Sequence, residues 1–283
     1  MKKQVCLSVL LMLVSINVLA SFQNEFDFAY LNSKQKEIDT DAYGIRYLHL
    51  FSPVEDSLVP YDAQLFLSRS DELSVGLIRS YDENSADSVS DEEKSNAYLL
   101  AGEYNFKETA FYAGISYLSI DSDSGLGSEE AESDYLNLNI GYYLNSMAEI
   151  ELLIGDFERE YSTYTIKGQS LGITYEQLFN VNERYFSLVV SLRERRADYG
   201  GIASSIPDAK SREFITKFSY YINKSTSIYA GVDLTFDDDE DNSQLYLLGI
   251  SHYFNQNYFA SIDFMDSDDL DLEAYRFEVG YRF

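Results

Sequence analysis

The sequence is short of several residue types, and each shortage excludes a class of protein. Its 283 residues include one cysteine, Cys6, which lies in an apolar N-terminal run, so the rest of the chain can build neither a disulfide framework nor a cysteine-based metal site. Only 21 lysines and arginines stand against 48 aspartates and glutamates, which gives a formal net charge of -27. Nucleic acid is bound by clustered basic side chains, so this balance disfavours nucleic acid as a partner.

Long apolar runs are also missing. Beyond the N-terminus no stretch approaches ~18 uninterrupted apolar residues, so the sequence predicts no transmembrane helix. The N-terminus combines Lys2 and Lys3 with an apolar run from Val5 to Leu19 and a small residue, Ala20, before Ser21. This pattern predicts a secretory signal peptide over residues 1–20, with a single domain over residues 21–283. A retained membrane anchor is the alternative, and the short run disfavours it.

Aromatic residues are abundant, with 25 tyrosines and 18 phenylalanines, whereas there are only 3 prolines and no tryptophan. In the last segment, from Leu272 to the end, bulky side chains occupy every second position. They are Tyr275, Phe277, Val279, Tyr281 and Phe283, and the residues between them are polar or small. Side chains on a strand alternate between its two faces, so this segment predicts a strand with one apolar and one wet face.

The same alternation recurs along the chain, with an inverted polarity. Leu136, Leu138 and Ile140 alternate with Asn137 and Asn139, and further segments repeat the pattern. An apolar face of this kind suits lipid outside a barrel, and a polar face suits a watery interior. A soluble barrel would show the reverse. In hydrocarbon every backbone amide must be paired, which strands achieve only in a closed sheet.

Two classes of connection separate the segments. Short connections are centred on asparagine, a residue that tolerates tight turns: Asn145, Asn180, Asn223 and Asn255. Longer acidic connections cover residues 82–94, 121–134, 237–242 and 266–271, and a polar loop is predicted over Asn32 to Asp41. Short turns at one end and longer loops at the other are typical of an outer-membrane barrel. We therefore predict an all-β fold, a transmembrane antiparallel up-and-down β-barrel of about 14 strands. Twelve or sixteen strands stay open, because Tyr61 to Ser70 fits either a long third strand or a periplasmic excursion.

Two stretches resemble known families. The closing strand, with Val279, Tyr281 and Phe283, resembles the C-terminal signal strand of Gram-negative outer-membrane barrels, which the barrel-assembly machinery reads. The turn Ser52-Pro53-Val54 and the segment from Pro60 to Leu67 resemble a family of general porins of Gram-negative bacteria, in which an acidic residue often stands where this chain has Gln64. The resemblance implies an outer-membrane channel for small hydrophilic solutes that contacts outer-membrane lipids and lipopolysaccharide. It implies no cofactor.

Charged residues on the wet parity are the candidate pore-lining residues. They are Arg193, Arg195, Lys217, Glu213, Asp233, Glu176, Arg276 and Glu278. Opposed inward charges can set an ion preference, or they can simply pair as structural salt bridges. Acidic loops at the mouth concentrate cations, so we expect passive diffusion with a mild cation preference. The alternative function is a non-conducting structural or surface-interaction barrel with acidic extracellular loops. No loop is long enough to predict a constriction loop, which favours a monomer or small homo-oligomer over a large trimeric porin.

Catalysis and metal binding find little support. The two histidines, His49 and His252, share parity with outward aromatic residues, so we expect them in an interfacial girdle and expect no enzyme activity. Acidic runs over residues 121–125 and 237–241 offer oxygen ligands but lack the complete calcium-loop pattern. We expect these runs to be solvated loops, with weak divalent-cation binding as the alternative.

Overall fold

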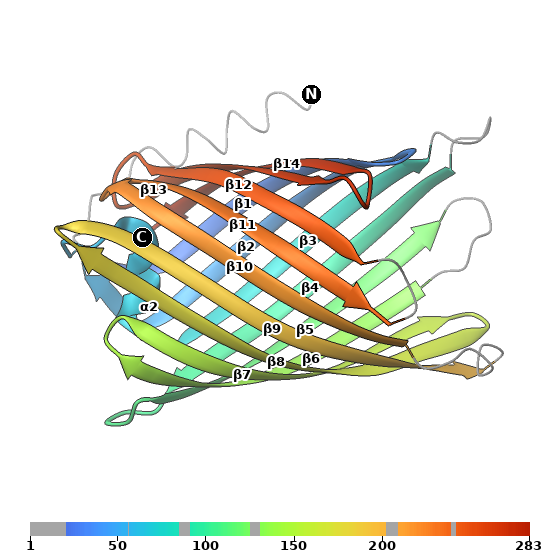
Figure 1. Ribbon diagram of the computed structural model, residues 1–283, viewed down its shortest axis with the longest axis horizontal. Helices are drawn as coiled ribbons and strands as arrows, with labels where there is room; N and C mark the ends of the chain where they lie inside the picture. Colours follow the sequence, from blue (N-terminus) through green and yellow to red (C-terminus); the bar gives the residue numbers. More distant parts are fainter. Residues whose placement is uncertain (1–20, 56, 85–90, 125–130, 202–208, 239–241) are drawn as a thin grey trace.

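The computed structural model describes residues 21–55, 57–84, 91–124, 131–201, 209–238 and 242–283, so the predicted signal peptide lies outside the described residues. Fourteen strands close into one antiparallel barrel in which each strand pairs with its chain neighbours and β1 pairs with β14 (Figure 1). The predicted fold class and strand number are confirmed. Within the described ranges, no helix has the length and apolar character needed to cross a membrane.

The strand bounds are β1 (Ser21–Gln35), β2 (Ile38–Glu55), β3 (Glu72–Asn84), β4 (Asp91–Asn105), β5 (Phe111–Ser124), β6 (Ala131–Asn145), β7 (Ala148–Tyr161), β8 (Tyr164–Val181), β9 (Arg184–Gly201), β10 (Ala209–Asn223), β11 (Thr226–Asp237), β12 (Ser243–Tyr253), β13 (Tyr258–Ser267) and β14 (Leu272–Arg282).

The register decides which side chains face outward. Phe28 pairs with Ile45 on one side and with Val279 on the other, and this parity carries the exposed large apolar side chains of the barrel. The neighbouring residue Asp27 pairs with Arg46 and Gly280 on the opposite face, which is the lumen. Paired residues in a sheet share a face, so this assignment extends strand by strand around the barrel. The predicted inverted polarity, with apolar residues outside and polar residues inside, follows from this register.

Several strands extend further than predicted, and β2 continues through Ser52-Pro53-Val54, which were predicted as a turn. The expected loop from Asn32 to Asp41 is mostly strand, and β1 turns into β2 through only Lys36 and Glu37. The predicted loops over residues 82–94 and 121–134 are likewise shortened by strand at both ends. Beyond the membrane both faces of a hairpin meet water, so the alternation that identifies a strand disappears while the backbone pairing continues.

The short turns lie at the end that also holds Ser21 and Phe283, which we call the periplasmic end. The side chains of Asn145, Asn223 and Asn255 accept backbone N–H groups within their turns, as predicted. The prediction for Asn180 is wrong: Asn145 and Asn223 form the last strand pair before their turns, whereas Asn180 lies one pair further inside β8. The turn after β8 uses Asn182 and Glu183, both with positive φ (52° and 65°), a conformation that asparagine tolerates better than most residues.

The connection between β2 and β3 is the exception among the periplasmic turns. It holds a 3-10 turn, η1 (Tyr61–Ala63), followed by a short helix, α2 (Gln64–Ser68), so the excursion is the correct alternative for this stretch. Arg69 takes a left-handed conformation (φ 47°) and ends the helix. Figure 1 shows α2 within the ring of strands, at the end of the barrel that carries the C-terminus.

Candidate functional site: the lumen and its periplasmic mouth

Residues 57–71, named here the plug segment, are fixed to the strands β11–β14 by polar contacts. Ser227 Oγ donates to Asp62 Oδ2 at 2.5 Å and Ser251 Oγ donates to Asp62 Oδ1 at 3.5 Å. The Tyr61 N–H donates to the Lys224 carbonyl at 2.9 Å, and Arg282 Nη1 donates to the Tyr61 carbonyl at 3.1 Å. Four groups from three strands and one turn therefore position the start of the segment.

The end of the plug segment is fixed to other parts of the wall. Arg69 Nη2 donates to the Asn145 carbonyl in the β6–β7 turn at 2.5 Å, and its guanidinium lies 4.0 Å from the centre of the Tyr143 ring. Phe66 and Leu67 pack against a buried cluster that contains Leu178 of β8. Since these partners belong to β6–β8 and the first set to β11–β14, the segment crosses the periplasmic mouth. The sequence predicted no constriction loop, and this segment is a connection at the periplasmic end that lies across the lumen.

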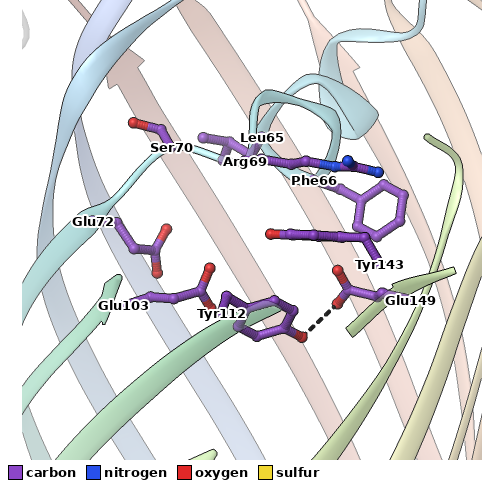
Figure 2. Close-up of a pocket in the computed structure, with 9 residues that line it drawn as sticks. All are labelled: Leu65, Phe66, Arg69, Ser70, Glu72, Glu103, Tyr112, Tyr143 and Glu149. Carbon is purple, nitrogen blue, oxygen red and sulfur yellow. Dashed lines mark hydrogen bonds between the residues drawn. The ribbon is translucent and has the colours of Figure 1, made fainter. Parts of the chain in front are cut away.

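A cavity of about 160 Å³ separates the plug segment from the wall formed by β3–β7. Its lining residues are Leu65, Phe66, Arg69, Ser70, Glu72, Glu103, Tyr112, Tyr143 and Glu149 (Figure 2). Three glutamates thus face one arginine. The three glutamates belong to β3, β4 and β7, so three strands supply the acidic lining of one cavity. Figure 2 shows Glu72 and Glu103 on one side of Tyr112 and Glu149 on the other.

Tyr112 organises the acidic wall. Its hydroxyl donates to Glu149 Oε1 at 3.0 Å and lies 3.2 Å from Glu151 Oε2. The ring can lie flat against the sheet because its neighbour across the strand pair is Gly141; a Cβ atom at that position would overlap the ring. Glycine is required here for close approach of a ring.

Ion pairs connect the two strands of the closing seam, β1 and β14, to β2. Arg282 Nε lies 2.5 Å from Glu25 Oε2, and both side chains are at most 3% exposed. Arg46 Nη2 then lies 3.0 Å from Glu25 Oε1 and 2.6 Å from Asp27 Oδ2. Arg282 also stacks on the rings of Phe22 and Tyr253 at 4.7 Å. The guanidinium group of Arg282 therefore connects β14, near the end of the chain, with β1 and with the plug segment.

The register puts all eight sequence-predicted pore-lining residues on the lumen face, in separate groups. Arg193 and Arg195 lie 3.8 Å and 3.4 Å from Glu213 Oε2. Arg276 contacts Glu278 and lies 4.0 Å from Asp263. The remaining three are Lys217, whose Nζ lies 4.1 Å from the Tyr229 ring centre, Glu176, which interacts with Lys217, and Asp233, whose Oδ1 is buried without a hydrogen bond. Their part in permeation stays a prediction.

Sequence reasoning missed the residues at the periplasmic mouth. Glu25, Asp27 and Glu103 follow the wet parity of their strands, so alternation could have found them. Asp62 and Arg69 carry no periodic signal, because a single helical turn is too short to show one. Their partners, such as Ser251 for Asp62, lie 189 residues away in the chain.

The histidines lie apart from the lumen. His49 Nδ1 is 2.9 Å from Asn24 Oδ1 and its ring packs edge-on against Phe51. His252 makes the same contact with Phe254. Both belong to the outward parity near the periplasmic end. In the described part of the chain no group of three or more His, Cys, Asp and Glu side chains is arranged to hold a metal ion. Both acidic runs considered for calcium include residues outside the described ranges.

Comparison with known families decides the identity of this barrel. The family model described as "Putative general bacterial porin" matches residues 1–283. The chain belongs to this family. It is therefore an outer-membrane channel protein of bacteria, as the resemblance of its closing strand and of Pro60–Leu67 implied. A comparison with curated protein sequences gives no significant match.

Solved structures share the fold of this porin at low identity. The Acinetobacter baumannii outer membrane protein Omp33 is 13% identical, with a TM-score of 0.59 over 93% of this chain and 99% of that one. The monoaromatic hydrocarbon channel CymD is 7% identical, with a TM-score of 0.55 over 93% and 89% of the chains. A bacterial polysaccharide outer membrane secretin is 10% identical, with a TM-score of 0.54 over 94% and 100%.

Proposed function

We propose that this porin is a passive channel for small hydrophilic cations, that its conductance is limited by the plug segment, and that it catalyses no reaction. The observation that carries the proposal is the acidic cavity beside the plug segment, where Glu72, Glu103 and Glu149 face a single basic residue, Arg69. A solute that passes the periplasmic mouth on this side meets three carboxyl groups and one guanidinium group.

The charge balance of this wall favours cations. A lining of one sign in a narrow, low-dielectric passage attracts counter-ions and repels co-ions. On the adjoining wall of β1, β2 and β14, Glu25 and Asp27 pair with Arg46 and Arg282, and toward the extracellular end Glu213 is shared by two arginines. The cavity wall therefore supplies the unbalanced charge that would set selectivity.

Reversal potentials in planar bilayers under a KCl gradient test this proposal. The wild-type protein should prefer K⁺ over Cl⁻, and the variant Glu72→Gln/Glu103→Gln/Glu149→Gln should lose most of that preference. A matched control replaces three exposed glutamates on the outward parity, Glu132, Glu160 and Glu273, by glutamine. It changes the net charge equally and should leave selectivity unchanged. Anion preference in the wild type would contradict the proposal.

The plug segment also favours a second candidate, the non-conducting structural barrel, because its contacts reach both sides of the mouth. Replacing residues 57–70 by a short Gly-Ser linker separates the two functions. A channel should then show a clearly larger single-channel conductance than the wild type. A variant that folds and stays silent would support the structural barrel.

A further inference from the structure

A group of basic side chains lies on the lipid-facing surface of β9 and β10, at the end opposite the plug segment. We define the outer basic cluster as Arg196, Lys210 and Arg212 together with Glu194. All four belong to the outward parity, since they continue the series of Leu192 on β9 and Phe214 on β10. The two strands are hydrogen-bonded neighbours in the barrel (Figure 1).

Three cations face two carboxylates in this cluster, Glu194 and the more distant Asp238. Arg196 Nη2 lies 2.8 Å from Glu194 Oε1, and Lys210 Nζ lies 2.9 Å from Glu194 Oε2. Arg212 Nε lies 3.5 Å from the same Oε2 atom, and its Nη1 reaches Asp238 only at 4.0 Å. Positive charge is therefore in excess here, on a chain whose formal net charge is -27.

The register adds an unfavourable contact. Arg196 and Lys210 are direct partners across the strand pair, and like charges in that arrangement destabilise a sheet. The side chain of Arg196 is 68% exposed and that of Arg212 is 55% exposed, so both guanidinium groups are accessible to further acceptors. An anion with several oxygen acceptors would relieve the repulsion and use these donors, and a phosphate matches the guanidinium fork.

The height of the cluster identifies the source of that anion. On β9 the outward apolar residues are Phe186, Leu188, Val190 and Leu192, bounded by Arg184 below and Glu194 above. With a rise of about 3.3 Å per residue and a tilt of about 40°, the stretch from Arg184 to Glu194 spans about 25 Å of membrane, the height of the apolar band of such barrels. The cluster thus lies directly above the band, at the level of the outer-leaflet headgroups. Exposed Phe236 stands in register beside Arg212 and continues the apolar surface below.

We propose that the outer basic cluster binds the phosphate groups of an outer-leaflet phosphoglycolipid, lipid A being the chemical type. Cations at two levels on adjacent strands suit a headgroup that carries more than one phosphate. The outward surface of β6 and β7 near this level is acidic instead, since Glu132 there stands in register with Glu160. The cluster therefore fixes one face of the barrel against the lipid.

Native mass spectrometry of the full barrel in detergent, titrated with diphosphoryl lipid A, tests the proposal. The variant Arg196→Gln/Lys210→Gln/Arg212→Gln should bind lipid A about 100-fold more weakly, since each basic side chain near an anionic surface contributes about fivefold. The matched control Lys34→Gln/Arg79→Gln/Lys94→Gln removes three outward charges on β1, β3 and β4 and should bind as the wild type does. Retention of lipid A by the cluster variant at wild-type level would overturn the proposal.

The same titration with other ligands shows which molecule supplies the phosphate. Fully dephosphorylated lipid A should bind the wild type as weakly as diphosphoryl lipid A binds the cluster variant. Millimolar inorganic phosphate should not displace lipid A, and phosphatidylglycerol should bind clearly more weakly. Displacement by phosphate, or equal binding of phosphatidylglycerol, would refute the assignment to a glycolipid. Should the triple variant fail to fold, Arg196→Gln and Arg212→Gln singly should each weaken binding about fivefold, and no effect of either would overturn the proposal.

Discussion

Replacing Arg282 by glutamine tests how the barrel seam and the plug segment are held together. Arg282 lies in β14, at most 3% exposed, with its Nε atom 2.5 Å from Glu25 of β1 and its Nη1 atom 3.1 Å from the Tyr61 carbonyl of the plug segment. Glutamine keeps a polar group at the site and removes the positive charge. The buried carboxylate of Glu25 then loses one of its two basic partners.

The expected loss of stability follows from these contacts. Removing one partner of a buried ion pair costs about 3–5 kcal/mol. The lower end applies here, because Arg46 still lies 3.0 Å from Glu25 and compensates part of the charge. The lost hydrogen bond to the Tyr61 carbonyl adds about 1 kcal/mol. We therefore expect the free energy of unfolding to fall by about 4 kcal/mol.

Urea unfolding of the barrel in detergent micelles, followed by far-UV circular dichroism, measures this loss; tryptophan fluorescence offers no signal because the chain has no tryptophan. Arg276→Gln is the control. Arg276 is also a lumen arginine of β14, but it is 44% exposed, so its loss should cost less than about 1 kcal/mol. The Arg282→Gln channel should also conduct better, because the plug segment loses an anchor. A loss below about 1 kcal/mol for Arg282→Gln would refute the reasoning.

Three further variants test other parts of the structure. Gly141→Val should destabilise the barrel by about 1–3 kcal/mol, measured by the same urea unfolding, because the new side chain overlaps the Tyr112 ring; a wild-type midpoint would contradict this packing. Deleting Phe283 should strongly reduce the amount of folded barrel recovered from outer membranes, because the Phe283 backbone pairs with Asn24 and the Phe283 carbonyl accepts two N–H groups of β1. Normal assembly of the deletion variant would contradict this role for Phe283. His49→Ala/His252→Ala should leave single-channel conductance unchanged, since both rings lie on the outward face, and altered conductance would show otherwise.

Much of the barrel could be predicted from the alternation of apolar and polar residues, because successive residues of a strand face lipid outside and water inside. Leu138 and Asn139 are assigned to opposite faces by their order alone, and so are Phe277 and Glu278. The same rule fails where lipid ends, which is why Asn32 to Asp41 looked like a loop. It also mistook Asn180 for a turn residue, when Asn182 takes the left-handed backbone two positions later.

The sequence by itself determined the architecture, since a period of two predicts strands, the alternation of short turns with longer acidic loops is typical of an outer-membrane barrel, and strands that cross a membrane must close. The tertiary structure alone decided the mouth of the channel. Asp62 meets Ser251 across 189 residues of chain, and Arg69 meets the Asn145 carbonyl across 76. Such contacts depend on where barrel closure brings distant strands and on the path of one short helix. Neither leaves a periodic trace in the chain, because the segment makes too few turns to repeat a pattern.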